Sequence, residues 1–429
     1  MKVLWLCNVC ISAVSAASGL KGSPGGGWLE GALNALKDQA GLEIVYCFPQ
    51  SDAKRLVCGK AGGLDYCGFY SRRSSGKRDI RLLEDTFRAV LKLYSPDIVH
   101  IHGTEAVHSY AMARAFNRPG RTIVSIQGMV SVYAKYYPVA TPNIMHSLTF
   151  HDLVRLDSLY LQMRRMRKRG YYEKKLIGST GHIIGRTDWD RACTEQINPS
   201  AAYHHCNETL RDAFYSTEKW SFERCERHSI FVSSSFPSYK CFHHVLEAMP
   251  HILSRYPDAK VHVTGPDVNR IPWYRISSYA RYVKKLIREL GLKDKVHFWG
   301  ALSAGEMADM YKRANVYVLP SAIENSPNSL GEAMMIGTPI VAADVGGVKN
   351  FLEHERQGYI YQQTAPYMIA HYVNKLFGSE DTANTMSAVA RQKARGIFDP
   401  QVNRRTLMDI YALVLAKGQG ESALSGDVL

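Results

Sequence analysis

Glu324 and Glu332 are the side chains whose types and spacing point most directly to chemistry. Seven residues separate them, and a helix is predicted to begin near Ser329. A helix N-terminus offers amide groups without partners and the positive end of the helix dipole, so Asn328, Ser329 and Leu330 are predicted to hold phosphate oxygens. Glu332, inside the helix, is placed to accept hydrogen bonds from a ribose. Glu324, ahead of the helix, is placed to meet a sugar attached beyond the phosphates.

Two apolar runs must position these carboxylates. Residues 316–319 form the first run, which ends at Pro320. Gly337 and Pro339 stop the helix, and residues 340–343 form the second run. This order of strand, loop, helix and strand is the unit of a parallel α/β sheet. Because ligands bind such sheets at the carboxyl ends of the strands, both glutamates are expected at a binding site.

The stretch PSAIENSPNSLGEAMMIGTPIVAADVGG, residues 320–347, resembles the E-x7-E signature of retaining, GT-B-fold glycosyltransferases of family 4. A bare pair of glutamates is a weak signal, but here strand end, loop, helix and glycines fall in order. The alternative is two solvated glutamates that flank a surface helix. The resemblance covers nearly the whole chain and is strongest over residues 295–361.

The resemblance implies an α/β, GT-B fold: two Rossmann-like, doubly wound parallel-sheet domains that face a cleft. The length of 429 residues also favours two domains. We expect an N-terminal acceptor-side domain over residues 1–225 and a nucleotide-sugar donor domain over residues 226–398. A C-terminal helix over residues 399–416 is expected to cross back to the first domain, and residues 417–429 to form a flexible tail.

A glycine loop follows the first predicted strand, residues 2–8. Gly26 and Gly27 precede a helix that begins at Trp28, and they resemble the family's glycine loop, where a ligand approaches the backbone closely. The N-terminus also resembles a signal peptide. Against that alternative, Asn8 interrupts the apolar run and Lys2 is its single basic residue.

Three polar residues follow predicted strands of the first domain. His102 begins the loop HGTE, where family members often carry a histidine; it is a candidate catalytic residue, or else a structural histidine. Many relatives place a donor-holding histidine where Gln127 stands, and glutamine keeps the hydrogen bonds without the charge. Arg186 follows the strand predicted at residues 181–185 and is expected to meet phosphate.

The second domain departs from the family at one loop. In VSSSFPSYK, Lys240 matches the family's lysine, whereas Ser234 and Ser235 replace a glycine and an arginine. In the family, the arginine normally binds the donor diphosphate. Binding of the diphosphate must therefore be weaker here or be supplied by another residue, for which Arg186 is our candidate. Thr264-Gly265 ends a strand where a base or ribose is expected to rest, with an ordinary turn glycine as the alternative.

The formal net charge of +14 indicates an anionic partner. Residues 164–175 contain seven basic residues with Tyr171 and Tyr172 beside them. This pattern favours an anionic membrane surface or a lipid-linked diphosphate acceptor. A solvated helix face and nucleic acid are the alternatives, and no nucleic acid is expected.

Nine scattered cysteines indicate reduced, mostly buried thiols and a cytoplasmic protein. No apolar run approaches the roughly 18 residues of a membrane span, so any membrane association is expected to be peripheral, on the inner face of the cytoplasmic membrane. Asp188 and Asp190 have a spacing that binds metal in the unrelated GT-A fold, but two carboxylates alone make a poor metal site. We expect Asp188 to cap a helix, and we expect no metal or cofactor.

The segments HGTE, SIQGMVSVYAKYY, GRTDWDRA and CNETLRDAFY resemble a bacterial subgroup linked to capsular or exopolysaccharide assembly. The resemblance implies retaining transfer of a hexosyl or related sugar from a nucleotide-sugar, with a UDP- or GDP-sugar expected, to a lipid-linked saccharide. Two alternatives remain open. One is a nucleotide-sugar epimerase of the same fold, and the other is a non-catalytic basic protein that binds nucleic acid or lipid.

Overall fold

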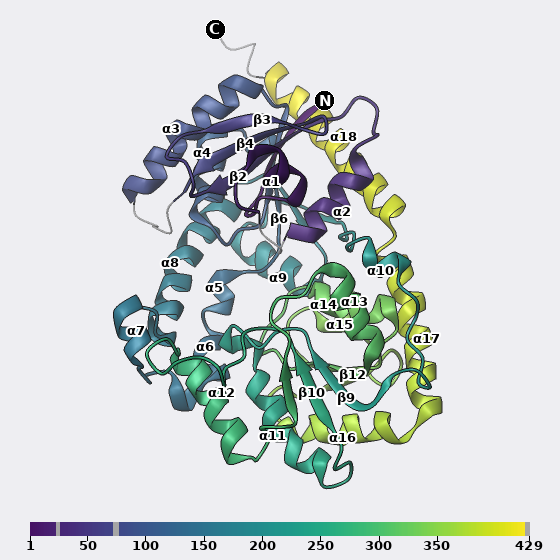
Figure 1. Cartoon of the computed structure of the whole chain (residues 1–429). Helices are drawn as coiled ribbons and strands as arrows, with labels where there is room; N and C mark the ends of the chain where they lie inside the picture. Colours follow the sequence, from purple (N-terminus) through teal and green to yellow (C-terminus); the bar gives the residue numbers. More distant parts are fainter. Residues whose placement is uncertain (23–25, 72–76, 425–429) are drawn as a thin grey trace. The chain divides into compact units, whose positions relative to one another are not determined.

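A computed structural model describes residues 1–22, 26–71 and 77–424 (Figure 1). The chain forms two compact units. Unit 1 comprises Met1–Ser131, Arg167–Thr209 and Asp399–Leu429, and unit 2 comprises Val132–Met166 and Leu210–Phe398.

This division differs from the expected boundary at residues 225 and 226 in two ways. Residues 132–166 belong to unit 2, because Tyr137, Met145 and Met163 are buried in the core of that unit. The chain also enters unit 2 earlier, after Thr209. Trp220 is the reason, since it is buried in the unit 2 core and its Nε1 donates to the carbonyl oxygen of Ala314 at 2.7 Å.

Unit 1 is built on an eight-stranded sheet in the order β3-β4-β2-β1-β5-β6-β7-β8. All neighbours are parallel except β3 and β4. Its strands are β1 (Lys2–Leu6), β2 (Glu43–Gln50), β3 (Val57–Ala61), β4 (Leu64–Tyr70), β5 (Ile98–His102), β6 (Thr122–Ser125), β7 (His182–Gly185) and β8 (Ala202–His205). β3 and β4 form an antiparallel hairpin at one edge of the sheet. The N-terminal segment that resembles a signal peptide contributes a central strand.

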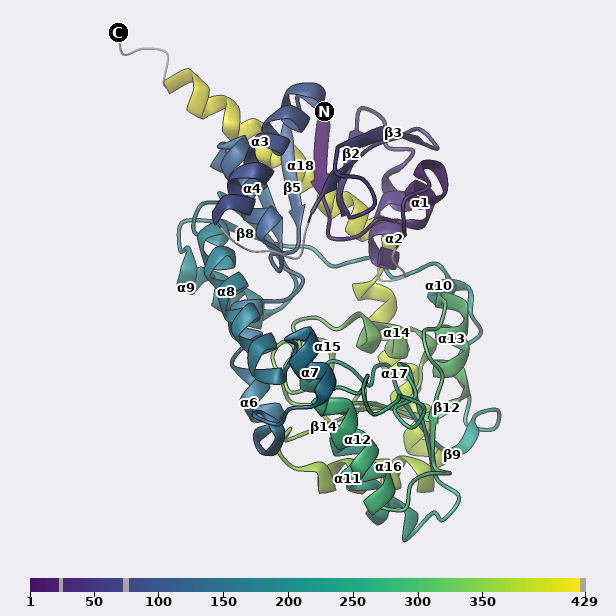
Figure 2. The same cartoon turned by 60° about the vertical axis from the view of Figure 1, so that its left-hand side comes forward.

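The helices of unit 1 are α1 (Ser12–Ser18), α2 (Gly27–Leu36), α3 (Lys77–Tyr94), α4 (Val107–Phe116), α9 (Asp188–Ile197), the later part of α8 (Leu159–Ile177) and α18 (Pro400–Leu424), with a short 3-10 turn η2 (Pro119–Arg121). α18 packs beside α2 (Figure 2). Trp5 of β1 donates its Nε1 hydrogen to the Tyr411 hydroxyl at 2.9 Å, which ties α18 to the sheet. α18 runs beyond the end expected at residue 416, and residues 425–429 of the predicted tail lie outside the described residues.

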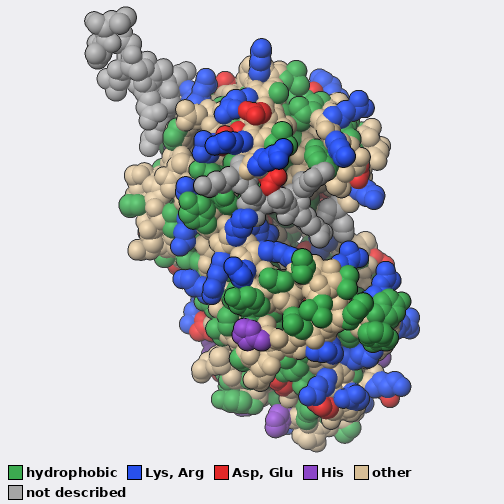
Figure 3. Space-filling model, turned by 90° about the vertical axis from the view of Figure 1, so that its left-hand side faces the viewer, with side chains coloured by type: hydrophobic (Ala, Val, Ile, Leu, Met, Phe, Trp, Pro, Cys, Tyr) green, Lys and Arg blue, Asp and Glu red, His purple; other side chains and the backbone are tan. Residues whose placement is uncertain are grey.

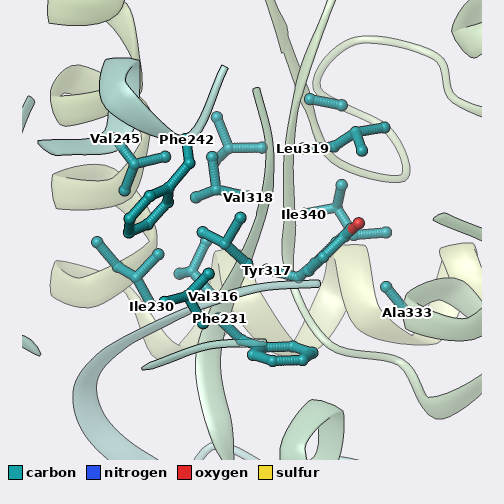
Figure 4. Packing of buried hydrophobic residues seen from close by; sticks show 14 of the residues in the cluster. Ile230, Phe231, Phe242, Val245, Val316, Tyr317, Val318, Leu319, Ala333 and Ile340 are labelled. Atoms are coloured by element: carbon teal, nitrogen blue, oxygen red, sulfur yellow. The ribbon is translucent and has the colours of Figure 1, made fainter. Parts of the chain in front are cut away.

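Unit 2 contains a six-stranded parallel sheet in the order β11-β10-β9-β12-β13-β14. Its strands are β9 (Glu226–Val232), β10 (Lys260–Val263), β11 (Val296–Phe298), β12 (Ala314–Leu319), β13 (Ile340–Ala343) and β14 (Tyr359–Tyr361). Every residue of β12 is buried, as expected for a strand covered by helices on both faces. In Figure 4, Val318 lies on the same side of the sheet as Phe242, and Tyr317 lies on the opposite side.

Unit 2 contains the first part of α8. Its other helices are α6 (Tyr136–Ala140), α7 (Phe150–Arg155), α10 (Ala213–Ser216), α11 (Phe242–Leu253), α12 (Ser278–Glu289), α13 (Ala304–Arg313), α14 (Asn328–Ile336), α15 (Val348–Phe351), α16 (Pro366–Gly378) and α17 (Glu380–Ile397). Short helical turns are α5 (Val130–Tyr133), which crosses the unit boundary, η3 (Pro142–Ile144) and η4 (Ser238–Lys240). Ser303 and Glu306 form a capping box at the start of α13. α7 and α8 are separate helices, because Leu156 between them adopts a left-handed conformation with φ of 51°. Among the described residues, no helix combines the length and apolar content needed to cross a bilayer.

Candidate functional site

Glu324 lies in the loop after β12, where the sequence placed it, and only 5% of the residue is exposed. Its Oε1 accepts a hydrogen bond from Lys240 Nζ at 2.6 Å and another from Ser321 Oγ at 2.6 Å. Lys240 is the last residue of η4, and Cys241 separates it from the first residue of α11. Two predicted site residues that are 84 positions apart therefore form one ion pair.

Gly346 fixes the backbone of the Glu324 loop. It has φ of 50°, and a Cβ atom at this position would overlap the carbonyl oxygen of Glu324. The neighbouring Gly347 donates its amide hydrogen to that oxygen at 3.1 Å. Gly347 is also the N-cap of α15. A glycine at residue 346 therefore allows the close approach that holds the Glu324 backbone.

α14 begins at Asn328, with Pro327 as an N-cap that makes no side-chain cap hydrogen bond. Asn328 and Ser329 are half-buried, whereas Leu330 is buried. The Leu330 amide donates to the carbonyl oxygen of Pro327 at 2.9 Å, so it is already engaged in the first turn. The amides at the very start of a helix lack intrahelical acceptors. Asn328 and Ser329 are therefore better placed than Leu330 to hold phosphate.

Glu332 is buried inside α14 and is paired with Arg211. Its Oε1 accepts hydrogen bonds from Arg211 Nη2 at 2.6 Å and from Arg211 Nε at 3.2 Å. Burial raises the pKa of Glu332, while the guanidinium beside it acts in the opposite direction. Arg211 also lies over the ring of Phe214, 4.9 Å from its centroid. Sequence reasoning missed Arg211, whose only signal was its place in the stretch CNETLRDAFY.

The serines that replace the family's glycine and arginine are fitted to a turn. Ser235 is fully buried, and its Oγ donates to the carbonyl oxygen of Thr264 at 3.0 Å. Gly265 has φ of 120°, and a Cβ atom there would overlap Ser235 Oγ. Gly265 also exchanges two backbone hydrogen bonds with Gly300, at 2.9 Å and 3.1 Å. A short side chain at residue 235 therefore matches the tight strand ends around Thr264 and Gly265.

Three of the predicted residues of unit 1, His102, Gln127 and Arg186, line one cavity within that unit, whereas Gly26 and Gly27 do not line it. His102 ends β5, Gln127 follows β6 and Arg186 follows β7, and these three strands are neighbours in the sheet. Glu208 follows β8 and lines the same cavity. Aromatic walls are contributed by Trp5 and Trp28. The sequence did not identify Glu208, Trp5 or Trp28 as site residues, because none of the three belongs to a recognisable motif.

His102 sits among aromatic rings. Its ring centroid lies 4.4 Å from that of Trp5, 3.9 Å from that of His100 and 5.6 Å from that of Trp28. Neither ring nitrogen has a hydrogen-bond partner among the described residues. Burial, and then the neighbouring His100, hold the pKa of His102 well below its usual range, so the imidazole is neutral. A neutral ring with unsatisfied nitrogens is suited to hydrogen-bond a ligand.

The positive charge of Arg186 is already paired within unit 1. It forms an ion pair with Glu208 and donates from Nη2 to the carbonyl oxygen of Ile126 at 2.8 Å. Its Nη2 also donates to Gln127 Oε1 at 3.3 Å, and Gln127 Nε2 donates to Glu208 Oε1 at 2.5 Å. The phosphate contact predicted for Arg186 therefore requires this network to open.

Gly26 and Gly27 stand at the start of α2. Gly26 is its N-cap, and a Cβ atom there would come within 2.9 Å of Val9 Cγ2. Gly27 is the first helical residue. Both therefore lie at the start of the predicted helix, but α1 separates this position from the end of β1, where the sequence predicted only a loop. The close packing against Val9 explains a glycine at residue 26.

Two groups resemble metal sites. The first consists of Asp188 and Asp190. Thr187, rather than Asp188, caps α9. Asp190 accepts hydrogen bonds from the Arg186 amide at 2.9 Å and from the Tyr203 hydroxyl at 2.5 Å.

In the second, the ligand atoms of Cys241, His243 and His244 lie within 4.8 Å of one another. Burial raises the pKa of Cys241 to about 12, and metal binding needs the thiolate. The second group thus fits a metal poorly, and independence from metal stays a prediction.

The comparisons with known proteins point to unit 2. Residues 218–393 match the family described as glycosyl transferases group 1. The chain is therefore similar to this family over that segment. An uncharacterized glycosyltransferase of Methanocaldococcus jannaschii is 32% identical over 137 residues, which cover 32% of each chain. A D-inositol 3-phosphate glycosyltransferase of Corynebacterium urealyticum is 27% identical over 172 residues, which cover 39% of each chain. The match thus spans about a third to two fifths of these curated relatives.

Solved structures extend the likeness to both units. Sucrose-phosphate synthase from Thermosynechococcus elongatus superposes with a TM-score of 0.72 at 15% identity, covering 97% of this chain and 99% of that chain. The Anabaena protein HepE in complex with UDP-glucose gives a TM-score of 0.65 at 14% identity, covering 96% of this chain and 99% of that chain. The chain has the GT-B fold, and the prediction of two Rossmann-like parallel-sheet domains is confirmed.

Proposed function

We propose that this protein is a glycosyltransferase that moves a sugar from a nucleotide-sugar to an acceptor hydroxyl. The observation that carries the proposal is the pair of ion-paired carboxylates around the N-terminus of α14, Glu324 with Lys240 and Glu332 with Arg211. The family match over residues 218–393 supports it. The structural likeness to a protein solved with UDP-glucose supports a nucleotide-sugar as donor, and we propose a UDP- or GDP-sugar.

In this proposal the diphosphate lies at the N-terminus of α14, where the amides of Asn328 and Ser329 and the helix dipole favour negative charge. Lys240 Nζ stabilises the charge that develops on the leaving diphosphate. Glu332 accepts hydrogen bonds from the ribose, in exchange for part of its contact with Arg211. The two hydrogen bonds that Glu324 accepts from described side chains go to Oε1, so we assign Oε2 to a hydroxyl of the donor sugar.

The cavity of unit 1 is assigned to the acceptor. Trp28 and Trp5 offer apolar ring faces, and His102 offers an unsatisfied neutral imidazole. The low pKa of His102 makes it a weak base, so we assign it to orienting the acceptor hydroxyl rather than storing its proton. We propose that the anomeric configuration is retained, and we assign no covalent nucleophile. No bound metal is required, because positive groups replace it at the diphosphate.

We propose a lipid-linked saccharide as the acceptor, in capsular or exopolysaccharide synthesis on the inner face of the cytoplasmic membrane. Residues 164–175 support a peripheral contact with anionic lipid, because six of their seven basic side chains are exposed and Arg169 is half-buried. The exposed basic residues are Arg164, Arg165, Arg167, Lys168, Lys174 and Lys175.

The test is a transfer assay with labelled UDP- and GDP-sugars and a polyprenyl-diphosphate-linked sugar. We expect one nucleotide class to give a lengthened saccharide whose new linkage keeps the donor configuration, measured by mass spectrometry and NMR. Conversion of the donor to its epimer without acceptor would instead identify the isomerase of the same fold. If the protein transfers no sugar but binds nucleic acid with an affinity that falls steeply as salt rises, the non-catalytic alternative would be favoured.

A further inference from the structure

α7 exposes its apolar residues and buries its acidic one. Leu153 and Val154 are 58% and 63% exposed, whereas Asp152 is 1% exposed. A surface helix usually turns its apolar side chains toward the core and its charges toward water. Leu148 and Leu156, which flank the helix, are also exposed. The segment therefore presents an apolar face that no described part of unit 2 covers.

Buried hydrogen bonds hold α7 in this orientation. Asp152 accepts from the Thr149 amide at 3.1 Å and completes a capping box with the Thr149 hydroxyl. The same carboxylate oxygen accepts from the Ser278 amide at 3.0 Å, at the start of α12. Arg281 of α12 donates to Ser147 Oγ at 2.8 Å. Turning the apolar side inward would break these bonds, so the exposure is a fixed feature of the fold.

A second segment extends the apolar face. Trp273 is 74% exposed, and its ring centroid lies 5.8 Å from that of Phe150 in α7. We name the resulting patch the α7 surface. It consists of six large apolar side chains: Leu148, Phe150, Leu153, Val154, Leu156 and Trp273. In Figure 3, hydrophobic side chains gather on the face that carries α7, with Lys and Arg side chains around them.

The rim of the α7 surface is basic. Arg155 in α7 and Arg275, two residues after Trp273, are exposed. The negative charges of two neighbouring acidic residues are neutralised in ion pairs: Asp157 pairs with Arg165 at 2.7 Å, and Asp267 pairs with Arg270 at 3.2 Å. Apolar and tryptophan side chains ringed by arginines match the boundary between the headgroups and acyl chains of an anionic bilayer.

We propose that the α7 surface docks on an anionic phospholipid bilayer. Its apolar side chains enter the headgroup region, and Arg155 and Arg275 lie against lipid phosphates. The surface is distinct from the basic residues 164–175, which lack large exposed aliphatic side chains. Its biological role rests on the lipid-linked acceptor proposed above, but the binding itself requires no transfer chemistry.

The first test is co-sedimentation with vesicles of phosphatidylcholine alone or mixed with phosphatidylglycerol. We expect the wild-type protein to bind the mixed vesicles, and the double variant Leu153→Glu/Val154→Glu to partition at least tenfold less. Leu82→Glu is the matched control, because Leu82 is 65% exposed but belongs to α3 of unit 1. No nucleotide-sugar is present, so a failed transferase proposal would leave this result unaffected.

A second measurement covers the case in which the double variant folds poorly. Tryptophan fluorescence should shift to the blue when the wild-type protein meets mixed vesicles, and Trp273→Phe should lose most of that shift. Arg155→Glu/Arg275→Glu should weaken binding to mixed vesicles at low salt and change little at high salt. Equal partitioning of the folded double variant and the wild type would overturn the proposal. A concentration-dependent dimer that the double variant abolishes would overturn it too, by assigning the surface to a second copy of the chain.

Discussion

The two units build their candidate sites at the carboxyl ends of parallel strands, but they treat charge differently. In unit 2, each carboxylate has its own cation, Lys240 for Glu324 and Arg211 for Glu332. In unit 1, Arg186 and Glu208 neutralise each other, and His102, between the aromatic walls, is neutral and its ring nitrogens bond no described residue.

This difference indicates two kinds of ligand. Lys240, whose side chain is 26% exposed against 6% for Glu324, lies beside a helix N-terminus and can reach an anion. The cavity of unit 1 offers aromatic faces and a neutral imidazole, which suit an uncharged ring with hydroxyl groups. We therefore expect substitutions in unit 2 to act on the diphosphate, and substitutions in unit 1 to act on the acceptor or on folding.

The largest expected effect is that of Lys240→Met in unit 2. Loss of the positive group at the leaving diphosphate should lower turnover by about 10²–10³. Lys312→Met is the control, because Lys312 is on α13 and pairs with Asp309 at 3.3 Å. Initial rates at saturating donor, with circular dichroism to verify folding, provide the measurement. Unchanged turnover in Lys240→Met would remove the lysine from the proposed chemistry.

Unit 1 contains two neighbouring histidines with different expected roles, a structural one, His100, and a functional one, His102. His100 bonds the Tyr411 hydroxyl at 2.6 Å and Ser125 Oγ at 2.7 Å, so His100→Phe should lower the free energy of unfolding by about 2–4 kcal/mol. His102 makes no such bond to a described residue, so His102→Phe should leave stability nearly unchanged and reduce transfer to the acceptor. Urea unfolding and acceptor kinetics distinguish the two. Equal losses of stability would contradict the assignment.

The Glu332–Arg211 pair should affect donor affinity more moderately. Glu332→Gln and Arg211→Met are each expected to weaken nucleotide binding about tenfold, a change of about 1.4 kcal/mol. The double variant should lose less than the sum of the two, because the residues act as one unit. Calorimetric titration with UDP and GDP provides the affinities, and Arg356→Met, at an exposed pair with Glu353, serves as control. Strict additivity would argue against a shared ribose contact.

A smaller effect concerns pH and the buried histidines. Burial lowers the pKa of His100 to about 3 and of His108 to about 4. Because the unfolded chain binds these protons near pH 6.5 and the folded chain does not, stability should be lost as pH falls below 6.5, by about 2 kcal/mol per histidine at pH 5. Glu105, whose pKa burial raises to about 7, acts in the opposite direction between pH 4.5 and 7. Urea unfolding at pH 7.5 and pH 5 measures the change, and His100→Phe should reduce it. An unaltered pH dependence in that variant would contradict a buried neutral His100.

Elements with strong local patterns could be predicted from the sequence. β12, α14 and β13 lie where the apolar runs and glycines predicted them. The break between α7 and α8 could not be seen, because it depends on Leu156 in a left-handed conformation that leucine rarely adopts. The edge hairpin β3–β4 was also missed, since its short strands lie among polar and glycine residues that are typical of loops.

The candidate site could be predicted residue by residue but not in its pairings. Glu324, Lys240 and Glu332 carry motif signals, whereas Arg211 pairs with Glu332 across 121 positions and carries none. The same holds for Glu208, whose contacts with Arg186 and Gln127 arise only when β6, β7 and β8 become neighbours. These pairings result from the topology of the sheets, which local sequence does not encode.

Hydrogen exchange with and without UDP or GDP tests the central claim most directly, because it locates the nucleotide in one unit or the other. We expect slower exchange over residues 321–336, around the start of α14, and over residues 238–242, where η4 leads into α11. Peptides that contain His102, Gln127 and Arg186 should change little with nucleotide alone. Protection confined to those unit 1 peptides, with none around α14, would contradict the assignment of the donor to unit 2.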